Sequence, residues 1–440
     1  MNGFNTNKCA LGGYIALLIM ALSSQPVLAE SGSNDPLWEA LKGGKFDFSA
    51  RYRFEHVDDN AATDQANAST IRTTLGYTTG RFHGFGLRLM GYDVSDVFED
   101  DFNDATGRPN SKTQFAVVAD PSETDLLEGY MSYAGTEGTL FKGSTLKLGR
   151  QIITYRNAPF HRFMGTVLWR QNWQNHDAFT FQNKSLPDTT INYAYSWNVN
   201  RIFTDEAVAS AKANFDSDSH FINIKYDGLS YAKLEGYAYL LDFENAASSS
   251  TETFGGRVSG GYPVSDKLKL LYAGEYASQE DYGDNTANVD EDYYLGEVGI
   301  KYTPGNFIKA IVLKFDYEVL TGNGTNSFLT ALATGHAFQG WTDRFLVTPG
   351  DGIEDAYFTA VVKAFGAKFI ASYHMIESDN LGYDYGDELD LLVVKTFKKH
   401  YTVGAKVGFY DADTNATNVA RGGSRAADVT KTWIWGQIKF

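Results

Sequence analysis

The sequence has almost no cysteine, little proline and no long apolar run beyond its leading segment. Of 440 residues one is cysteine, Cys9, and nine are proline. Cys9 precedes the apolar run Ala10–Leu22 in a segment that we expect to be removed. Disulfides, thiolate catalysis and cysteine metal sites are then excluded for the mature chain. No later stretch approaches the roughly 18 apolar residues of a membrane-spanning helix, which excludes a helical transporter.

Positive charge is also scarce. The chain carries 38 Lys and Arg against 54 Asp and Glu, a formal charge of −16. Binding to nucleic acid depends on neutralising phosphates with a basic surface, so no nucleic-acid partner is expected. An acidic exterior suits lipopolysaccharide instead, because divalent cations can bridge its phosphates to carboxylates.

The N-terminus has the features of a secretory signal peptide. Lys8 supplies a positive charge, Ala10–Leu22 is apolar, and Val27-Leu28-Ala29 is a small-residue cleavage site. We expect residues 1–29 to be removed and residues 30–440 to form one domain. A membrane anchor is the alternative, but the apolar run is short for a span.

The mature chain is rich in aromatic residues, and its apolar and polar residues alternate with a period of two. Aromatics make up 15% of the sequence, and mean hydropathy is −0.31. From Lys45 onward, Phe46, Phe48 and Phe54 alternate with charged or polar residues, which is typical of a strand with one apolar face. Similar segments recur along the whole chain. They cover 45–57, 69–80, 85–95, 124–134, 144–154, 177–184, 189–198, 219–226, 231–243, 252–262, 267–279, 292–302, 307–320, 354–363, 367–377, 387–397, 399–410 and 430–440.

The connections between these segments alternate between short turns and long polar loops. Many segments have about ten residues, the length of a tilted transmembrane strand. The sequence therefore predicts an all-β fold: a closed, antiparallel transmembrane β-barrel of about 18 strands in a Gram-negative outer membrane. An even strand count places both termini in the periplasm. The chain ends on Phe440, which resembles the terminal strand recognised by the outer-membrane assembly machinery. We expect a monomer in contact with lipid and lipopolysaccharide.

Ten of the fifteen arginines lie before residue 171. Strand alternation places Arg51, Arg53, Arg72 and Arg88 on the face of each strand opposite to its apolar residues. They should face the lumen, because an arginine at the lipid midplane costs about 2–4 kcal/mol. Arg150 shares the parity of Leu146 and Leu148, a conflict that a bulge or a position at the rim would resolve. Lumen arginines select anions. Pairing with carboxylates such as Asp47 and Glu55, which would leave a merely polar wall, is the alternative.

The segment 149–177 concentrates Arg, Trp, Asn, Gln and His, including Arg156, Arg162, Arg170 and His161. Guanidinium and amide groups bind acids and hydroxyls, and indole rings stack on sugar faces. The segment is long enough to fold inward as a constriction. We interpret it as a binding segment for anionic carbohydrate.

This segment resembles the alginate-export family of outer-membrane proteins. The likeness rests on Gly149-Arg150-Gln151, Arg162-Phe-Met-Gly165, Trp169-Arg170-Gln171-Asn172 and Asp177, and on a second block, Gly335–Phe345, followed by Asp351-Gly352. The resemblance implies an 18-stranded monomer whose electropositive, partly loop-covered channel passes an anionic polysaccharide. It also implies that Arg150, Arg162, Arg170, Asp177 and Arg344 are pore or pore-loop residues.

The sequence thus predicts a channel for anionic, alginate-like oligo- or polysaccharides, with a porin of little selectivity for small solutes as the alternative. The predicted pore residues are Arg51, Arg53, Arg72, Arg88, Arg150, Arg156, Arg162, Arg170, Asp177 and Arg344. We expect no enzyme, since no nucleophile motif accompanies the scattered histidines. We expect no cofactor and no metal. The acidic stretches Asp93–Asp104 and Asp411–Asn415 could bind Ca²⁺ but are more typical of solvated loops.

Overall fold

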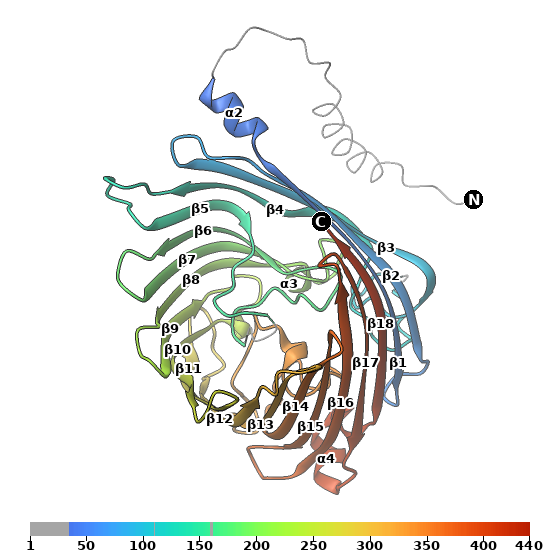
Figure 1. Ribbon diagram of the computed structural model, residues 1–440. Helices are drawn as coiled ribbons and strands as arrows, with labels where there is room; N and C mark the ends of the chain where they lie inside the picture. The colour runs from blue at the N-terminus through green and yellow to red at the C-terminus, as the bar shows by residue number, and fades with distance from the viewer. Residues whose placement is uncertain (1–34, 110, 159–161) are drawn as a thin grey trace, which may run out of the picture.

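The computed structural model describes residues 35–109, 111–158 and 162–440, so the predicted signal peptide (1–29) and His161 lie outside the described residues. The described strands form one closed antiparallel sheet of 18 strands (Figure 1). The all-β barrel and its strand number are therefore as predicted. No helix in the described ranges has the length and apolar character needed to cross a membrane.

The strands follow one another around the barrel in sequence order, each paired with its chain neighbours. They are β1 Lys45–Asp59, β2 Ala66–Thr78, β3 Phe85–Asp101, β4 Glu123–Ala134, β5 Ser144–Gln151, β6 Asn175–Asn183, β7 Thr189–Asn200, β8 Asn214–Tyr226, β9 Ala232–Leu241, β10 Thr251–Pro263, β11 Leu268–Asp281, β12 Asp290–Tyr302, β13 Ile308–Leu320, β14 Ile353–Ala364, β15 Ala367–Glu377, β16 Asp384–Phe397, β17 Tyr401–Ala412 and β18 Val429–Lys439. The helices are α2 Pro36–Lys42, α3 Ser210–Ala213 and α4 Ala416–Arg421, with short 3-10 turns η1 Ala247–Ser249, η2 Gly335–Ala337 and η3 Gly423–Ala426.

The barrel closes by pairing β1 with β18. The register runs from Ser49 opposite Lys439 to Asp59 opposite Val429. The backbone of Phe440 extends this pairing, because its N–H donates to the Phe48 carbonyl (2.9 Å) and its carbonyl accepts from the Phe48 N–H (3.2 Å). Closure leaves no free edge among the described strands, which is the condition for a sheet to stand in hydrocarbon.

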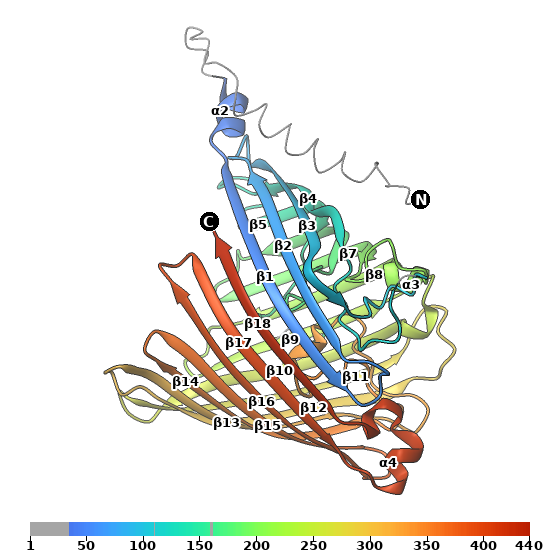
Figure 2. The same ribbon diagram turned by 90° about the vertical axis from the view of Figure 1, so that its right-hand side faces the viewer.

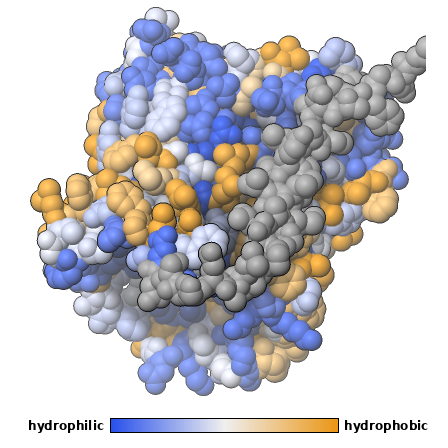
Figure 3. All heavy atoms as spheres, turned by 90° about the horizontal axis from the view of Figure 1, so that it is seen from above, coloured by the Kyte–Doolittle hydropathy of each residue, from blue (hydrophilic) through white to orange (hydrophobic). Residues whose placement is uncertain are grey.

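Apolar side chains cover the outside of the wall. On β3, Leu87 and Leu89 are each 50% exposed, whereas Met90 and Tyr92, of opposite parity, are buried. The same alternation recurs on the other strands, and the space-filling view shows apolar patches on the flanks of the barrel (Figure 3). Because large apolar side chains exposed in such number would aggregate in water, this outer surface faces lipid.

The two ends of the barrel differ. Short connections such as 264–267, 365–366 and 398–400 gather at one end, here called the turn end, near α2 and the C-terminus. Long connections gather at the opposite end, the loop end, where α4 lies (Figure 2). This is the predicted alternation of short turns and long loops.

Some strands extend farther toward the loop end than the sequence predicts. β3 continues to Asp101, so most of the acidic stretch Asp93–Asp104 is strand rather than loop, and β8 begins at Asn214 instead of 219. Beyond the lipid, a strand no longer needs apolar residues on its outer face. The hydrophobic alternation therefore ends before the strand does.

Two long connections, 152–174 and 321–352, fold into the barrel instead of standing above it. Phe163 and Met164 of the first pack against Tyr237 and Tyr239 of the wall, and Phe328 and Leu332 of the second join the same cluster. Figure 1 shows both segments, in teal and orange, inside the ring of strands. The inner apolar core therefore lies in the lumen and positions the candidate site.

Candidate functional site

Arginines of β1 hold the segment 152–174 against the inner wall. Arg51 donates to the carbonyls of Leu168 (3.1 Å) and Arg170 (2.6 Å) and to the side-chain oxygen of Gln171 (3.0 Å). Arg53 donates to the carbonyl of Trp169. Backbone carbonyls in a lumen segment need donors once they leave water, and these guanidinium groups supply several at once.

Arg72 of β2 contributes in a different way. Its guanidinium lies 3.6 Å from the ring centre of Trp173, a cation–π contact, and the residue is only 4% exposed. Trp173 in turn packs against Met90, Tyr92, Val94 and Leu127. The segment 152–174 is thus fixed by three arginines of the first two strands.

Carboxylates accompany these arginines. Glu55 lies 3.1 Å from both Arg53 and Arg170, and Asp120, from the connection 102–122, pairs with Arg53. Asp120 also accepts the backbone N–H of Gln171 at 2.7 Å. The charges of this cluster are therefore largely compensated within the protein.

The second inward segment is held by acidic side chains of β16. Glu388 accepts from the N–H (2.7 Å) and the hydroxyl (2.6 Å) of Thr342, and Asp390 accepts the N–H of Trp341 at 3.1 Å. Asp343 pairs with Lys431 of β18 at 2.9 Å. The predicted second block, Gly335–Phe345, is therefore anchored to β16 and β18, a part of the wall that follows its own strands in the ring.

The two segments also bind each other. Trp169 stacks on His336 with ring centres 4.7 Å apart, and Arg170 pairs with Asp343 at 2.9 Å. The N–H of Gly165 donates to the carbonyl of Leu332 at 2.8 Å. Burial lowers the pKa of His336 to about 3, so its imidazole is neutral at physiological pH. We call this pair of segments the constriction.

The remaining predicted pore residues also have acidic partners. Arg88 pairs with Asp47 and with Glu128 (3.0 Å), and Arg344 pairs with Asp59 (2.6 Å). Arg156 bridges Glu235 (3.0 Å) and Glu275 (2.6 Å), and Arg162 lies 2.9 Å from Glu318. For these residues the geometry corresponds to the alternative in which lumen arginines pair with carboxylates.

Arg150 and Asp177 contact each other at the loop end of β5 and β6. The distance is 2.8 Å, and Arg150 also reaches Asp125 of β4 at 3.0 Å. Arg150 is the penultimate residue of β5, directly after Gly149, whose φ is +122°. The position at the rim resolves the parity conflict with Leu148, since the guanidinium meets two carboxylates rather than lipid.

The constriction leaves a hollow on each side. On the loop side a cavity of about 610 Å³ is lined by the inward segments and by the connections 102–122 and 201–213. On the turn side a cavity of about 520 Å³ lies between the constriction and strands β8–β14. Its lining mixes cations with carboxylates. They are Arg156, Arg162, Lys225, Lys233, Arg257 and Lys314, and Asp227, Glu235, Glu275, Glu297, Asp316 and Glu318.

Sequence reasoning missed several cations that line the loop-side cavity, among them Arg201, Lys212 and Lys431. Each is a single basic residue in a loop or strand, without a motif around it. Only the closure of the barrel brings them beside Arg170 and Arg344. Alternation could have placed Lys431 inward, but no local signal marks Arg201 or Lys212.

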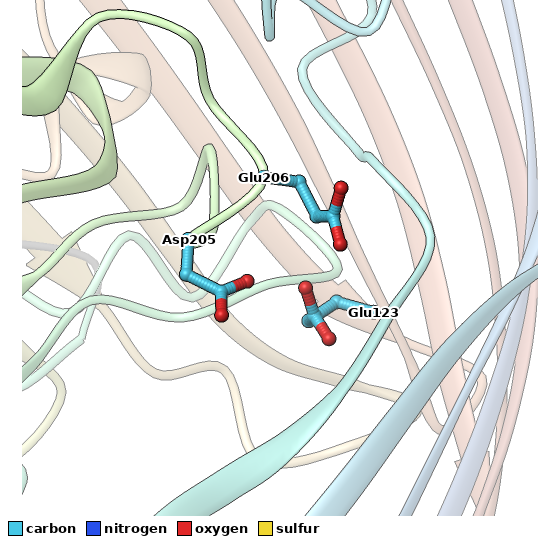
Figure 4. A group of neighbouring side chains, drawn as sticks. All are labelled: Glu123, Asp205 and Glu206. Atoms are coloured by element: carbon cyan, nitrogen blue, oxygen red, sulfur yellow. The ribbon is translucent and has the colours of Figure 1, made fainter. Parts of the chain in front are cut away.

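Two further groups of polar side chains lie close together. The carboxylates of Glu123, Asp205 and Glu206 turn toward one another (Figure 4), but Glu206 is paired with Arg108 at 2.8 Å. His176 contacts the hydroxyl of Ser196 at 3.1 Å, and both residues are fully buried, so an external substrate cannot reach them.

Comparison with known proteins gives fold neighbours without sequence relatives. No family model and no curated protein matches the chain. Solved structures do match. OccAB2 of Acinetobacter baumannii has a TM-score of 0.66 at 15% identity, covering 91% of this chain and 99% of its own. OpdK of Pseudomonas aeruginosa, solved with vanillate, has a TM-score of 0.65 at 11% identity, covering 91% and 99%.

OccK9 (OpdG) of Pseudomonas aeruginosa is similar at a TM-score of 0.66 and 11% identity, covering 91% and 100%. At such identities the likeness concerns the fold. The chain is a closed barrel of the Gram-negative outer membrane, as predicted, with its turn end toward the periplasm. The resemblance to the alginate-export family finds no support in these comparisons.

Proposed function

We propose that the chain is an outer-membrane channel for small solutes that favours organic anions. The observation that carries this proposal is the charge of the loop-side cavity. Five cations line it, namely Arg170, Arg201, Lys212, Arg344 and Lys431, against the two carboxylates of Asp59 and Asp343. Within the described ranges, neither Arg201 nor Lys212 forms an ion pair. A solute entering from outside therefore meets an excess of positive charge.

Arg201 is held in place without being neutralised. Its guanidinium donates to the carbonyl of Ala211 at 2.6 Å and lies 4.3 Å from the ring centre of Phe215. Burial lowers its pKa to about 10, which still leaves it charged at neutral pH. A fixed, partly desolvated cation attracts a carboxylate more strongly than a fully hydrated one does.

The same cavity is also partly apolar. Phe115, Val167, Ile202 and Phe203 contribute to its lining beside the cations. A carboxylate attached to an aromatic or aliphatic body satisfies both kinds of surface. Vanillate, the molecule with which the OpdK structure was solved, is an aromatic carboxylate and belongs to this class.

The size of the two hollows favours a small solute over a polymer. The constriction separates cavities of about 610 and 520 Å³, and its two segments are fixed to neighbouring parts of the wall, β1–β2 and β16–β18. The anionic, alginate-like polysaccharide that the resemblance implies has no support in the comparisons. The alternative, a porin for small solutes, is better supported by the comparisons. The second candidate function is such a porin with only modest selectivity, which the many ion pairs of the lumen favour.

Planar-bilayer recording tests the proposal. In a salt gradient, the reversal potential of the wild-type channel is expected to have the sign that indicates anion preference. The double variant Arg201→Gln, Lys212→Gln is expected to show a smaller anion preference. Lys142→Gln, in the turn 135–143, is the matched control because Lys142 lies at the turn end, paired with Glu137. In liposomes, an aromatic carboxylate should enter faster than a neutral sugar of similar size. A cation preference of the wild type would contradict the proposal.

A further inference from the structure

The lipid-facing wall has an apolar hollow across β14–β18, with a volume of about 620 Å³. Ala360 of β14 lies opposite Ala371 of β15, which lies opposite Leu391 of β16. Val393, two residues farther along β16, lies opposite Ala405 of β17. The small alanine side chains lie among larger outward-facing neighbours, so the wall is depressed where they meet.

The larger neighbours of the hollow are accessible from the membrane. Phe369 is 40% exposed, and Leu391 and Val393 are each 39% exposed. The hollow is continuous with the rest of the apolar outer surface and lies on the opposite side of the wall from the lumen. Its occupant therefore comes from the lipid phase, and an acyl chain has the shape and polarity to fill it.

Lysines lie directly beside this hollow at the turn end. Lys395 shares the outward face of β16 with Leu391 and Val393 and lies two residues nearer the turn. Its Nζ is 5.2 Å from the ring centre of Phe397, and Lys398 and Lys399 follow in the turn to β17. Within the described part of the chain, none of the three lysines forms an ion pair. The turns 365–366 and 398–400 contain no Asp or Glu.

Exposed aromatic residues mark the depth at which these lysines lie. Phe397, Tyr401 and Phe440 are 44%, 43% and 57% exposed at the same end of the wall. Aromatic side chains gather at the level of lipid headgroups. Lys395, Lys398 and Lys399 are thus at headgroup level, with the apolar hollow on the hydrocarbon side of them.

We propose that this wall binds a glycerophospholipid with an anionic headgroup from the periplasmic leaflet. One acyl chain lies in the hollow, and the headgroup phosphate contacts Lys395, Lys398 and Lys399. Basic residues near a membrane surface favour anionic over zwitterionic lipid, and clustered ones bind particular headgroups. The site lies outside the lumen and is independent of the solute that the channel passes.

Native mass spectrometry of the detergent-purified barrel tests this inference. The protein is delipidated and then offered phosphatidylglycerol, phosphatidylcholine or soluble glycerol phosphate. One variant carries Lys395→Gln, Lys398→Gln and Lys399→Gln, and a second carries Ala371→Phe, which fills the hollow. Lys184→Gln, a turn lysine of another wall, and Val258→Phe, an outward-facing position on β10, are the matched controls.

The wild type and both controls are expected to retain phosphatidylglycerol in preference to phosphatidylcholine. Each lysine removed should lower that preference roughly fivefold. Ala371→Phe should lower retention of both lipids while the lysines remain. Equal retention of the two lipids by the wild type, unchanged preference in the triple lysine variant, or equal displacement of lipid by soluble glycerol phosphate would each overturn the proposal. Channel conductance, measured in parallel, should be unchanged in every variant.

Discussion

Trp169 and His336 lie face to face inside the barrel, with ring centres 4.7 Å apart and ring planes 1° from parallel. Trp169 belongs to the segment between β5 and β6, and His336 to the segment between β13 and β14. The Nζ of Lys406 lies 4.2 Å from the centre of the Trp169 ring, and the rings of Trp433 and Trp435 lie nearly perpendicular to it, with centres 5.5 and 5.6 Å away. The stack therefore joins two loops to the wall formed by β17 and β18.

Replacing Trp169 with alanine should loosen the constriction. Replacing a fully buried tryptophan by alanine costs about 3–5 kcal/mol, and because Trp169 is only partly buried, a smaller loss falls on the contact between the two loops. We expect a higher single-channel conductance and more frequent current fluctuations, recorded in planar bilayers. Trp197→Ala is the control, since Trp197 is 39% exposed on β7. An unchanged conductance of Trp169→Ala would show that the stack does not limit the passage.

Arg170 and Asp343 should be energetically coupled. They form a buried pair at 2.9 Å across the two loops, and removing one partner of such a pair typically costs about 3–5 kcal/mol. Arg170→Gln and Asp343→Asn should each destabilise the barrel, and the double variant should be less destabilised than the sum of the two. Urea unfolding of all four proteins in detergent measures the coupling. Additive effects would exclude it.

The barrel should lose stability in acid through His336. Its pKa is about 3 when folded, against 6.5 for an unperturbed histidine. Between these two pH values the histidine is protonated in the unfolded chain but neutral in the folded chain. Stability from this group is therefore present above pH 6.5 and declines as the pH falls toward 3. His336→Gln should have a shallower decline in thermal midpoint over that range. An identical pH profile of the two proteins would contradict this.

Lysines at the periplasmic mouth should add to anion preference. Lys269 lies opposite Lys301, and Lys363 lies opposite Lys368, each pair on the inward parity of its strands. Within the described residues none of the four forms an ion pair. Glutamine at all four positions should shift the reversal potential toward cations at low salt. The shift should nearly vanish at 1 M salt, where the screening length is about 3 Å. Lys184→Gln provides the control, and a shift that persists at 1 M would indicate another cause.

Deleting Phe440 should slow assembly more than it weakens the finished barrel. The residue is 57% exposed, so little burial is lost, but its backbone extends the closing pair of β1 and β18. We expect a smaller folded fraction in cells, measured by heat-modifiable migration on gels. The folded fraction should keep a thermal midpoint close to that of the wild type. Normal assembly of the truncated chain would show that Phe440 is not part of the recognition signal.

Alternation predicted the strand number and most strand positions, because each transmembrane strand must be apolar on one side. It was less successful at the loop end, where β3 continues to Asp101. There the outer face is solvated, so charged residues no longer mark the end of a strand. The inward fold of the segment between β5 and β6 was also predicted, from its length.

Asp47 and Glu55 were named as possible partners of the lumen arginines, and they pair with Arg88 and Arg53. The other partners could not be predicted. Asp120 and Glu55 lie far apart in sequence yet share Arg53, and Asp343 meets Arg170 only because two loops enter the lumen together. Strand parity predicts whether a side chain points into the lumen, but not which residues it contacts there. The carboxylates that compensate these cations come from strands and loops elsewhere in the chain.

By itself the sequence determined a closed barrel. Strands with this alternation can form all their backbone hydrogen bonds in hydrocarbon only if they pair in a closed ring. The tertiary structure alone decided which charges remain available to a solute. Arg51 and Arg53 hold a loop, whereas Arg201 and Lys212 reach the cavity without a carboxylate partner among the described residues. Charge compensation depends on distances across the lumen, and those are fixed only when the ring closes and the loops fold inward.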